Sequence, residues 1–240
     1  MTSRTGVRRW GRWLAVGVAV AVAVAVAGPY VYIHFFEAKP AARLGLSDQP
    51  AATTAAGAAS TKGQTASAGR GAWVVAAGSQ VGYRVKEVLF GQDNTAVGRT
   101  GSVTGKLTID GVTVTSGSFT ADLTSVTSDQ SRRDVSFQER IMDTATYPTA
   151  TFTLTRPIRL GSIPPDGVQV TAQATGNLAM HGVTRQVQVT VTARHTGQRI
   201  QVSGSLPVTF ADWNIPNPSF GPVTTEDHGL LEFLLNLSPS

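Results

Sequence analysis

The sequence of 240 residues contains no cysteine. It therefore forms no disulfide, offers no thiolate nucleophile and cannot ligate a metal through cysteine. A lipid anchor attached to a cysteine is excluded as well, so a membrane anchor would have to be part of the polypeptide itself.

Histidine is almost as scarce, with four residues in the chain, and no two of them have the H-x-x-x-H spacing of a metal site. The G-x-S-x-G motif of a hydrolase nucleophile is also missing. The polar cluster at residues 226–228 precedes the last expected strand, where a structural role is the simpler interpretation. We therefore expect a protein that is not an enzyme and that carries no cofactor.

Positive charge is concentrated near the N-terminus. The whole chain has a net charge of +5 and a pI near 10.0. Eight of the 20 Lys and Arg and two of the 15 Asp and Glu fall in residues 1–72, which leaves 12 basic and 13 acidic residues for the remainder. Because the C-terminal part is close to neutral, the basic pI does not indicate a nucleic-acid partner.

Residues 13–36 form a long apolar run in which only His34 resists burial in hydrocarbon. As a helix this run would extend about 35 Å, enough to cross a hydrocarbon core of about 30 Å. It is preceded by four arginines and no acidic residue: Arg4, Arg8, Arg9 and Arg12. The positive-inside rule then predicts a cytoplasmic tail of residues 1–12, a single transmembrane helix of residues 13–36 and an extracytoplasmic C-terminal domain at the plasma membrane.

A cleaved signal peptide is the competing interpretation, because Ala25-Val26-Ala27 has the pattern of a cleavage site. The apolar run continues for nine residues beyond it, however, which favours an uncleaved signal-anchor. Residues 37–72 follow and are rich in Ala, Thr, Gly and Ser. Such a composition predicts a flexible linker, with an end-to-end distance of about 30 Å, between the membrane and the domain of residues 73–240.

Apolar and polar residues alternate from Trp73 onward, which is typical of strands with one buried face. The alternating runs lie at residues 79–85, 102–109, 119–123, 150–154, 168–174, 187–191, 200–210 and 231–237. Turn signals stand at residues 110–111, 116–117, 164–167 and 196–197. The pattern predicts about eight antiparallel strands, a number that closes readily into a barrel.

Residues 128–142 interrupt the alternation. Ser131 and Asp134 have the spacing of a capping box, and Phe137 and Ile141 lie four residues apart, on one face of a helix. We predict a short helix that covers one end of the barrel and is stopped at Tyr147-Pro148.

Several motifs occur in a fixed order along the chain. They are R-R-D at 132–134, M-D at 142–143, Y-P-T-A-T-F at 147–152 and G-N-L-A-M-H-G-V-T-R at 176–185, together with S-x-V-x-Y-x-V at 79–85 and V-x-G-x-L at 103–107. The ordered set resembles the YceI-like family of exported lipid-binding proteins over residues 73–237. The sequence departs from the common pattern in Ala179, where threonine is frequent, in its membrane anchor, and in a long loop at residues 214–221 that affects one rim of the barrel.

The resemblance implies an all-β, eight-stranded, lipocalin-like barrel whose apolar tunnel holds a polyisoprenoid, an isoprenoid quinone or a fatty-acid-like amphiphile. The residues expected to line the tunnel are Tyr83, Phe119, Leu123, Phe152, Leu154 and Met180. Small residues on the apolar faces would keep it open: Gly105, Ala121, Ala150, Ala172 and Ala174.

Arg132, Arg133 and His181 are the candidates for binding a headgroup at the mouth, since arginine suits phosphate. A solvated helix face or pairing with Asp134 for the two arginines, and a turn position for His181, are the simpler interpretations. A second hypothesis for the whole domain is a non-enzymatic cell-envelope interaction or stress module with a filled core. That hypothesis predicts no cavity and an exposed sticky patch at residues 214–221.

Overall fold

The computed structural model of the protein describes residue 18 and residues 39–46, 70–89, 91–221 and 223–240. The predicted cytoplasmic tail lies outside these residues, as do the predicted transmembrane helix apart from Val18 and most of the predicted linker. Within the described ranges, no helix is long and apolar enough to cross a membrane.

The described part of the chain is built of strands with a few short helical turns. The strands are β1 (Arg70–Val75), β2 (Gln80–Leu89), β3 (Gln92–Thr100), β4 (Val103–Asp110), β5 (Thr113–Asp122), β6 (Thr127–Ser128), β7 (Thr149–Leu154), β8 (Ile158–Arg159), β9 (Gln169–Met180), β10 (Val183–Thr196), β11 (Arg199–Thr209), β12 (Val223–Thr225) and β13 (His228–Pro239). The helical segments are η1 (Leu123–Ser125), α2 (Ser131–Val135), η2 (Ser136–Ile141) and η3 (Phe210–Trp213).

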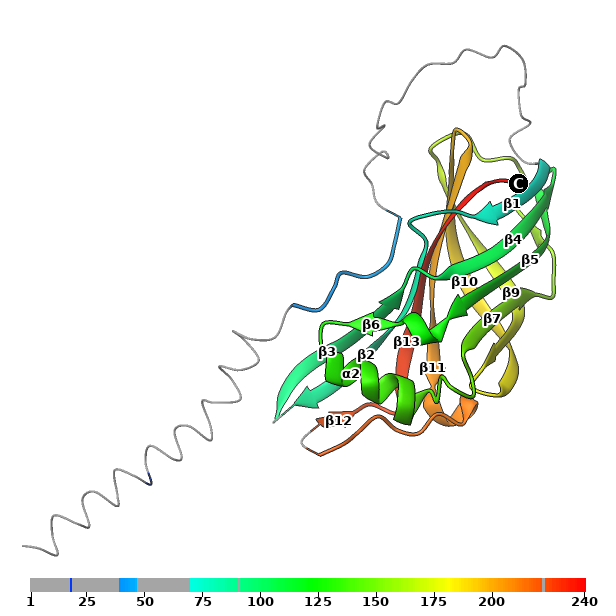
Figure 1. Ribbon diagram of the computed structural model, residues 1–240. Coiled ribbons are helices and arrows are strands. Elements are labelled where there is room, and N and C mark those ends of the chain that lie inside the picture. Colours follow the sequence, from blue (N-terminus) through cyan, green and yellow to red (C-terminus); the bar gives the residue numbers. More distant parts are fainter. Residues whose placement is uncertain (1–17, 19–38, 47–69, 90, 222) are drawn as a thin grey trace, which may run out of the picture.

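Eight of these strands close into an antiparallel barrel, in the order β1-β4-β5-β7-β9-β10-β11-β13 (Figure 1). The ring closes where Trp73 of β1 pairs with Pro239 of β13 and Val75 pairs with Leu237. Closure leaves these strands without free edges, which protects them from pairing with other chains. The predicted eight-stranded antiparallel barrel is thus confirmed.

The barrel is extended at one end by a second group of strands. After a break at residues 76–79, β2 pairs with the first half of β13, β3 pairs with β2, and β6 pairs with β3. Strand β12 lies beside the outer half of β2. Figure 1 shows α2 at this end, opposite the hairpin of β10 and β11. The helix therefore covers the extended end, as the sequence predicted.

The alternating runs correspond to β2, β4, β5, β7, β9, β10, β11 and β13. The sequence missed β1, which begins at Arg70 inside the predicted linker, and β3, in which Ala96, Val97 and Gly98 are all buried, so that no alternation appears. The predicted turn at residues 116–117 is wrong, because Gly117 lies within β5 and faces the barrel interior.

The helix predicted within residues 128–142 is confirmed at residues 131–141, but the predicted capping box of Ser131 and Asp134 is wrong. Gln130 is the N-cap residue, and no side chain caps the helix. The Asp134 carboxylate instead accepts hydrogen bonds from the backbone N–H and the hydroxyl of Ser128. The helix ends at Ile141, before Tyr147-Pro148 is reached. Two residues after that end, Asp143 has the left-handed conformation with a φ of 41°.

The inner wall contains four pairs in which an aromatic ring lies over a glycine of the neighbouring strand. A Cβ built on the glycine would stand 2.3 Å from the Tyr83 ring at Gly98, 2.7 Å from the Phe119 ring at Gly105, 2.4 Å from the Phe152 ring at Gly176 and 2.7 Å from the Phe233 ring at Gly204. Such aromatic–glycine contacts across strands are known to stabilise sheets. Because each ring occupies the place of a missing side chain, it lies against the wall and leaves the centre of the barrel free.

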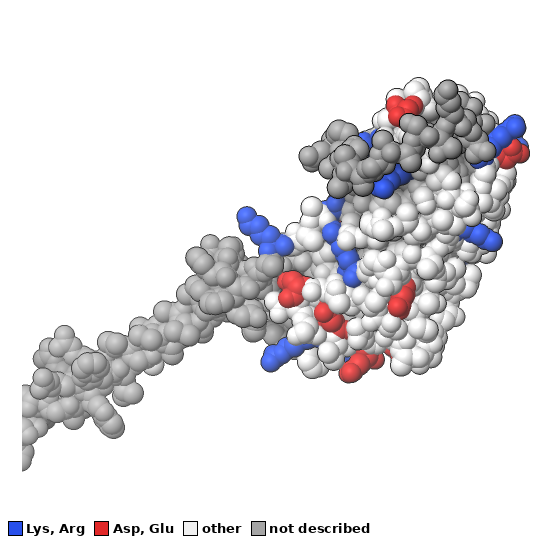
Figure 2. Space-filling view, turned by 45° about the horizontal axis from the view of Figure 1, so that its top comes forward, with Lys and Arg blue, Asp and Glu red and all other residues white. Residues whose placement is uncertain are grey.

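The surface has little charge. The face in Figure 2 is mostly uncharged, with single Lys, Arg, Asp and Glu side chains scattered over it. This agrees with the near balance of acidic and basic residues in the C-terminal part of the chain.

Gly176→Ala tests the aromatic–glycine contacts. The added methyl group would overlap the Phe152 ring and the carbonyl oxygen of Thr153, 2.5 Å away. We expect the free energy of unfolding, measured by urea denaturation, to fall by about 1–3 kcal/mol, as in overpacked cores. Gly101→Ala is the matched control, because its nearest contact would be an ordinary 3.7 Å to Ser79. Equal stability of the two variants would contradict the overlap.

Candidate functional site

The domain contains two cavities that meet inside it. The upper cavity lies within the ring of eight strands and reaches the end of β10, and the lower cavity lies at the extended end beside α2 and η2. The upper cavity has a volume of about 220 Å³ and the lower cavity about 1030 Å³. Val81, Ala150 and Leu231 line both, so the two cavities adjoin at this level. Ligand sites in proteins have volumes of roughly 300–1,000 Å³, and the lower cavity alone is of this size.

The wall of the upper cavity is almost entirely hydrocarbon. It is formed by the inward faces of β4, β5, β7, β9, β10, β11 and β13, with Phe119, Phe152 and Phe233 among them. Ala121, Ala150, Ala172 and Ala174 also line it, as expected of the small residues. Gly105 acts differently from the prediction: it does not line the cavity but allows Phe119 to lie flat.

The far end of the upper cavity carries the polar residues Arg194 and His195, beside Ile163 and Pro164 of the preceding loop. Asp166 fastens that loop to the β10–β11 hairpin. Its carboxylate lies 3.2 Å from Nδ1 of His195 and accepts a hydrogen bond of 2.8 Å from the N–H of Gly197. The alternation pattern did not identify this end of the cavity, because it combines residues 163–164 of the loop before β9 with residues 194–195 at the end of β10, which are far apart in the sequence.

The lower cavity combines an apolar wall with a polar rim. Val85, Leu89, Phe137 and Met142 supply apolar surface, and α2 and η2 contribute Arg132, Arg133, Glu139 and Arg140. Tyr83 stacks on Phe137 with a ring separation of 5.0 Å and an angle of 14°. Burial raises the pKa of the Tyr83 hydroxyl far above its ordinary value, so the phenol stays neutral.

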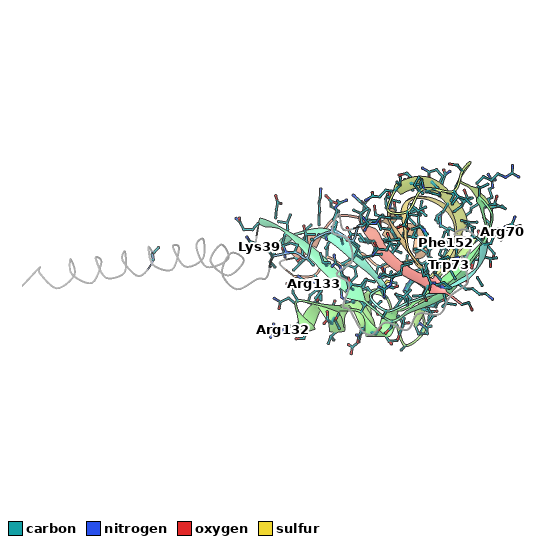
Figure 3. All side chains as sticks on the ribbon, turned by 90° about the horizontal axis from the view of Figure 1, so that it is seen from above. Lys39, Arg70, Trp73, Arg132, Arg133 and Phe152 are labelled. Carbon is teal, nitrogen blue, oxygen red and sulfur yellow. The ribbon has the colours of Figure 1, made fainter. Side chains whose placement is uncertain are left out.

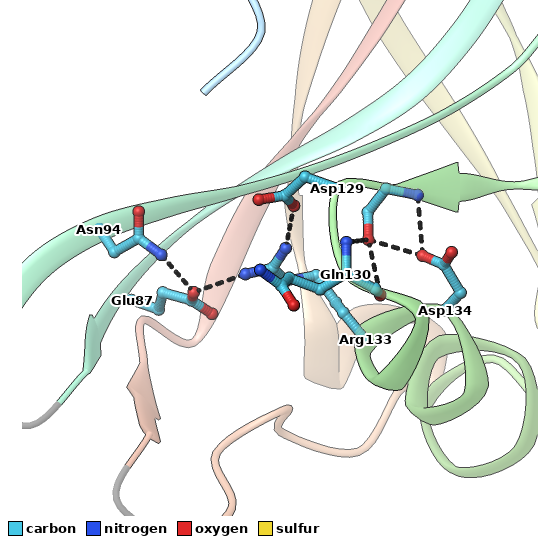
Figure 4. A network of polar contacts seen from close by, with 7 residues as sticks. Glu87, Asn94, Asp129, Gln130, Arg133 and Asp134 are labelled. Atoms are coloured by element: carbon cyan, nitrogen blue, oxygen red, sulfur yellow. Dashed lines mark hydrogen bonds and ion pairs between the residues drawn. The ribbon is translucent and has the colours of Figure 1, made fainter. Parts of the chain in front are cut away.

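A buried ion pair stands in the lower cavity (Figure 4). Glu87 projects inward from β2, and its Oε1 accepts a hydrogen bond of 3.1 Å from Arg133 and another of 2.8 Å from Asn94. Arg133 also donates to the carboxylate of Asp129. Burial lowers the pKa of Arg133, but the Glu87 and Asp129 carboxylates outweigh burial, and the net effect is to raise it. The guanidinium is therefore already neutralised by two carboxylates from the protein.

The loop at residues 214–221 forms part of the rim of the lower cavity. Ile215 is buried, whereas Phe220 is 73 % exposed, and both line the cavity with Pro218. Arg140 holds the loop against η2: it donates a hydrogen bond of 2.8 Å to the carbonyl of Pro218 and lies 5.4 Å from the centre of the Phe220 ring. The sequence indicated that this loop affects a rim but did not identify Arg140.

All six predicted tunnel residues line one of the cavities. Phe119, Phe152 and Leu154 lie on the upper cavity, and Tyr83, Leu123 and Met180 on the lower one. Arg132 and Arg133 also lie on the lower cavity, where Arg132 is exposed and Arg133 is paired. Figure 3 shows both arginines at one end of the domain and Trp73, Phe152 and Arg70 toward the other.

His181 is the exception among the predicted site residues, because it lines neither cavity. It sits in the turn between β9 and β10 with a φ of 50°. Its Nδ1 lies 3.0 Å from the carbonyl oxygen of Trp213, and its ring packs on Tyr147. The structure thus places it as a turn residue and not at the mouth. Among the described residues, no group of acidic and histidine side chains could hold a metal ion.

A closed eight-stranded barrel has an interior that is either filled by side chains or holds one small ligand, as in lipocalins. The pattern that defines the YceI-like domain matches residues 73–237. The chain therefore belongs to the YceI-like family.

A solved structure with a TM-score above 0.5 has the same fold. A polyisoprenoid binding domain from Saccharophagus degradans is 16% identical, with a TM-score of 0.57, covering 70% of this chain and 98% of that domain. BcnA from Burkholderia cenocepacia is 22% identical, with a TM-score of 0.49, covering 64% of this chain and 95% of that protein. No curated protein sequence matches the chain significantly.

Removing Arg133 tests the buried ion pair. Arg133→Gln leaves Glu87 without its cationic partner, and we expect the free energy of unfolding to fall by about 2–3 kcal/mol. The double variant Glu87→Gln/Arg133→Gln removes the lone charge and should recover at least half of that loss. Arg132→Gln, which changes an exposed neighbour, should stay within about 0.5 kcal/mol of the wild type. A double variant less stable than the single one would contradict the pairing.

Proposed function

We propose that the protein binds a long-chain apolar lipid, of the polyisoprenoid, isoprenoid quinone or fatty-acid type, in the two adjoining cavities of its barrel. The observation that carries the proposal is the continuity of apolar wall from the upper cavity into the lower one, through Val81, Ala150 and Leu231. The polyisoprenoid-binding relative in Saccharophagus degradans supports the same ligand class. The filled interaction module, by contrast, requires a core without these cavities.

The dimensions favour a chain-like ligand. Burial of each CH₂ group stabilises binding by about 0.8 kcal/mol. Burial of several isoprene units along the two cavities together would therefore offset an association cost of roughly 4–15 kcal/mol. The headgroup would then lie at the rim of the lower cavity, where the polar side chains gather. Because the upper wall offers hydrocarbon to the ligand, we infer that the protein holds its ligand without converting it.

The location of the domain is part of the proposal. The apolar run at residues 13–36, with arginines before it, supports a single membrane-spanning anchor with the barrel at the outer face of the plasma membrane. A barrel held there would take its ligand from the adjacent leaflet. Protease digestion of spheroplasts before and after lysis would test this location, since a barrel at the outer face is cut before lysis and a cytoplasmic one only after it.

The ligand is tested by mass spectrometry of an organic extract of residues 39–240, which contain the whole described domain, purified from a cell envelope without detergent. We expect a stoichiometric long-chain lipid. An empty extract, together with no uptake of a fluorescent polyprenyl probe, would overturn the proposal.

Ala150→Leu tests the passage between the cavities. Ala150 is buried and lines both, so a larger side chain would divide the tunnel. We expect at least tenfold weaker binding of a long polyprenyl probe, or about 1.4 kcal/mol, with a smaller effect on a probe short enough for the lower cavity. Thr153→Leu, on the exposed face of the same strand, is the control and should bind both probes like the wild type. Equal loss for both probes in Ala150→Leu would indicate a folding defect, which circular dichroism would show.

A further inference from the structure

A carboxylate is buried on the outside of the barrel. Glu232 lies on β13 between Leu231 and Phe233, which face the cavities, so its own side chain points outward. A glutamate on the outer face of a barrel is normally exposed to water. Glu232 is only 2 % exposed. Something outside the barrel wall must therefore cover it.

The cover is residues 39–46, here called the strap, which run along the outside of the barrel (Figure 1). Two arginines of the wall join the strap to Glu232. Arg84 donates a hydrogen bond of 2.9 Å to Glu232 and one of 2.6 Å to the carbonyl oxygen of Ala41. Arg99 lies 3.9 Å from the other carboxylate oxygen and donates to the carbonyl oxygen of Ala42.

The strap adds a cation of its own and some apolar surface. Arg43 lies 3.9 Å from Glu232, and Leu44 and Leu46 are half-buried. Three guanidinium groups thus surround one carboxylate. The excess positive charge is met by the two backbone carbonyl oxygens of the strap, because charge-assisted hydrogen bonds are stronger than neutral ones.

Gly82 leaves space on the outer face of β2 for the side chains around Glu232. In the sheet register Gly82 of β2 stands between Glu232 of β13 and Arg99 of β3. A Cβ at Gly82 would lie 2.8 Å from Cγ of Arg99. The glycine therefore lets the Arg99 side chain cross β2 toward Glu232, and the cluster forms on top of it.

The strap also has a direction relative to the cavities. Figure 3 shows Lys39, the first residue of the strap, on the same side of the domain as Arg132 and Arg133, which line the lower cavity. Arg70, where β1 begins, lies at the other end. The rim of the lower cavity bears two exposed apolar side chains, Val135 and Phe220.

We propose that the strap clamps the barrel to the chain that follows the membrane anchor, and so turns the mouth of the lower cavity toward the bilayer. The inference rests on the anchor of the proposed function. Only residues 37 and 38 separate the predicted transmembrane helix from the strap. The barrel is then held at the membrane surface with Phe220 and Val135 facing the leaflet. Its distance from the membrane and its orientation vary less than a flexible linker about 30 Å long would allow.

Because the chain has no cysteine of its own, spin labels can be attached at introduced cysteines alone. Spin labels at Lys39→Cys and Gln188→Cys in the full-length protein should give one narrow distance distribution by pulsed electron paramagnetic resonance. The triple variant Arg84→Gln/Arg99→Gln/Glu232→Gln removes the cluster without leaving a lone buried charge and should broaden the distribution. Leu44→Ser/Leu46→Ser should do the same and leaves the barrel wall unchanged. Arg156→Gln/Arg199→Gln, which alters two exposed arginines, is the control.

Orientation is measured in phosphatidylcholine vesicles that contain the full-length protein and headgroup-attached quenchers. A fluorophore at Phe220→Cys should be quenched at least threefold more than one at Gln198→Cys in the β10–β11 hairpin. The strap variants should abolish the difference. Equal quenching in the wild type, or a broad distance distribution, would overturn the inference while lipid binding by the barrel stands. Failure of the protein to float with vesicles would instead overturn the anchor, and with it the orientation.

Discussion

The empty interior of the barrel depends on the contacts between aromatic rings and glycines. In an eight-stranded barrel the inward side chains are just large enough to fill the lumen. Phe119, Phe152 and Phe233 of the ring strands would do so if their rings pointed to the axis. Each ring lies instead over a glycine of the neighbouring strand, at a place where a Cβ would overlap it. The wall gains aromatic packing while the centre stays open, so the cavity and the stability of the sheet have the same origin.

The two cavities differ in the surface that they offer to a ligand. The upper wall is hydrocarbon, whereas the lower rim carries charge. That charge is largely balanced within the protein, since Arg133 is paired with Glu87 and Asp129. A phosphate at Arg133 would have to displace a carboxylate, while a neutral hydroxyl or quinone would not. The other two arginines that line the lower cavity are Arg132, which is exposed, and Arg140, which is tied to the 214–221 loop.

The sequence predicted the strands and the cavity residues because alternation reports which face of a strand is buried. It could not predict the aromatic–glycine contacts, because Phe152 and Gly176 are brought together only by the register of β7 and β9. The same limit applies to Glu87 and Arg133, which are 46 positions apart. The sequence left both a turn position and a headgroup contact open for His181, because its place in the motif does not say whether the ring faces a cavity. Strand β3 was missed because its buried residues are consecutive and its ends are rich in polar residues.

An unfilled apolar cavity lowers the free energy of unfolding of a domain. On a scale of about 24 cal/mol per Å³ for cavities made in cores, the upper cavity of about 220 Å³ corresponds to roughly 5 kcal/mol. Whole domains are stable by only about 5–15 kcal/mol. The sequence nevertheless places alanine at 121, 150, 172 and 174, where larger apolar residues would fill the space. A ligand that fills it would recover this free energy on binding, which supports the proposed uptake of an apolar chain. A clamp that directs its mouth to a lipid surface would then shorten the path of that chain through water, which is the step that apolar chains disfavour most.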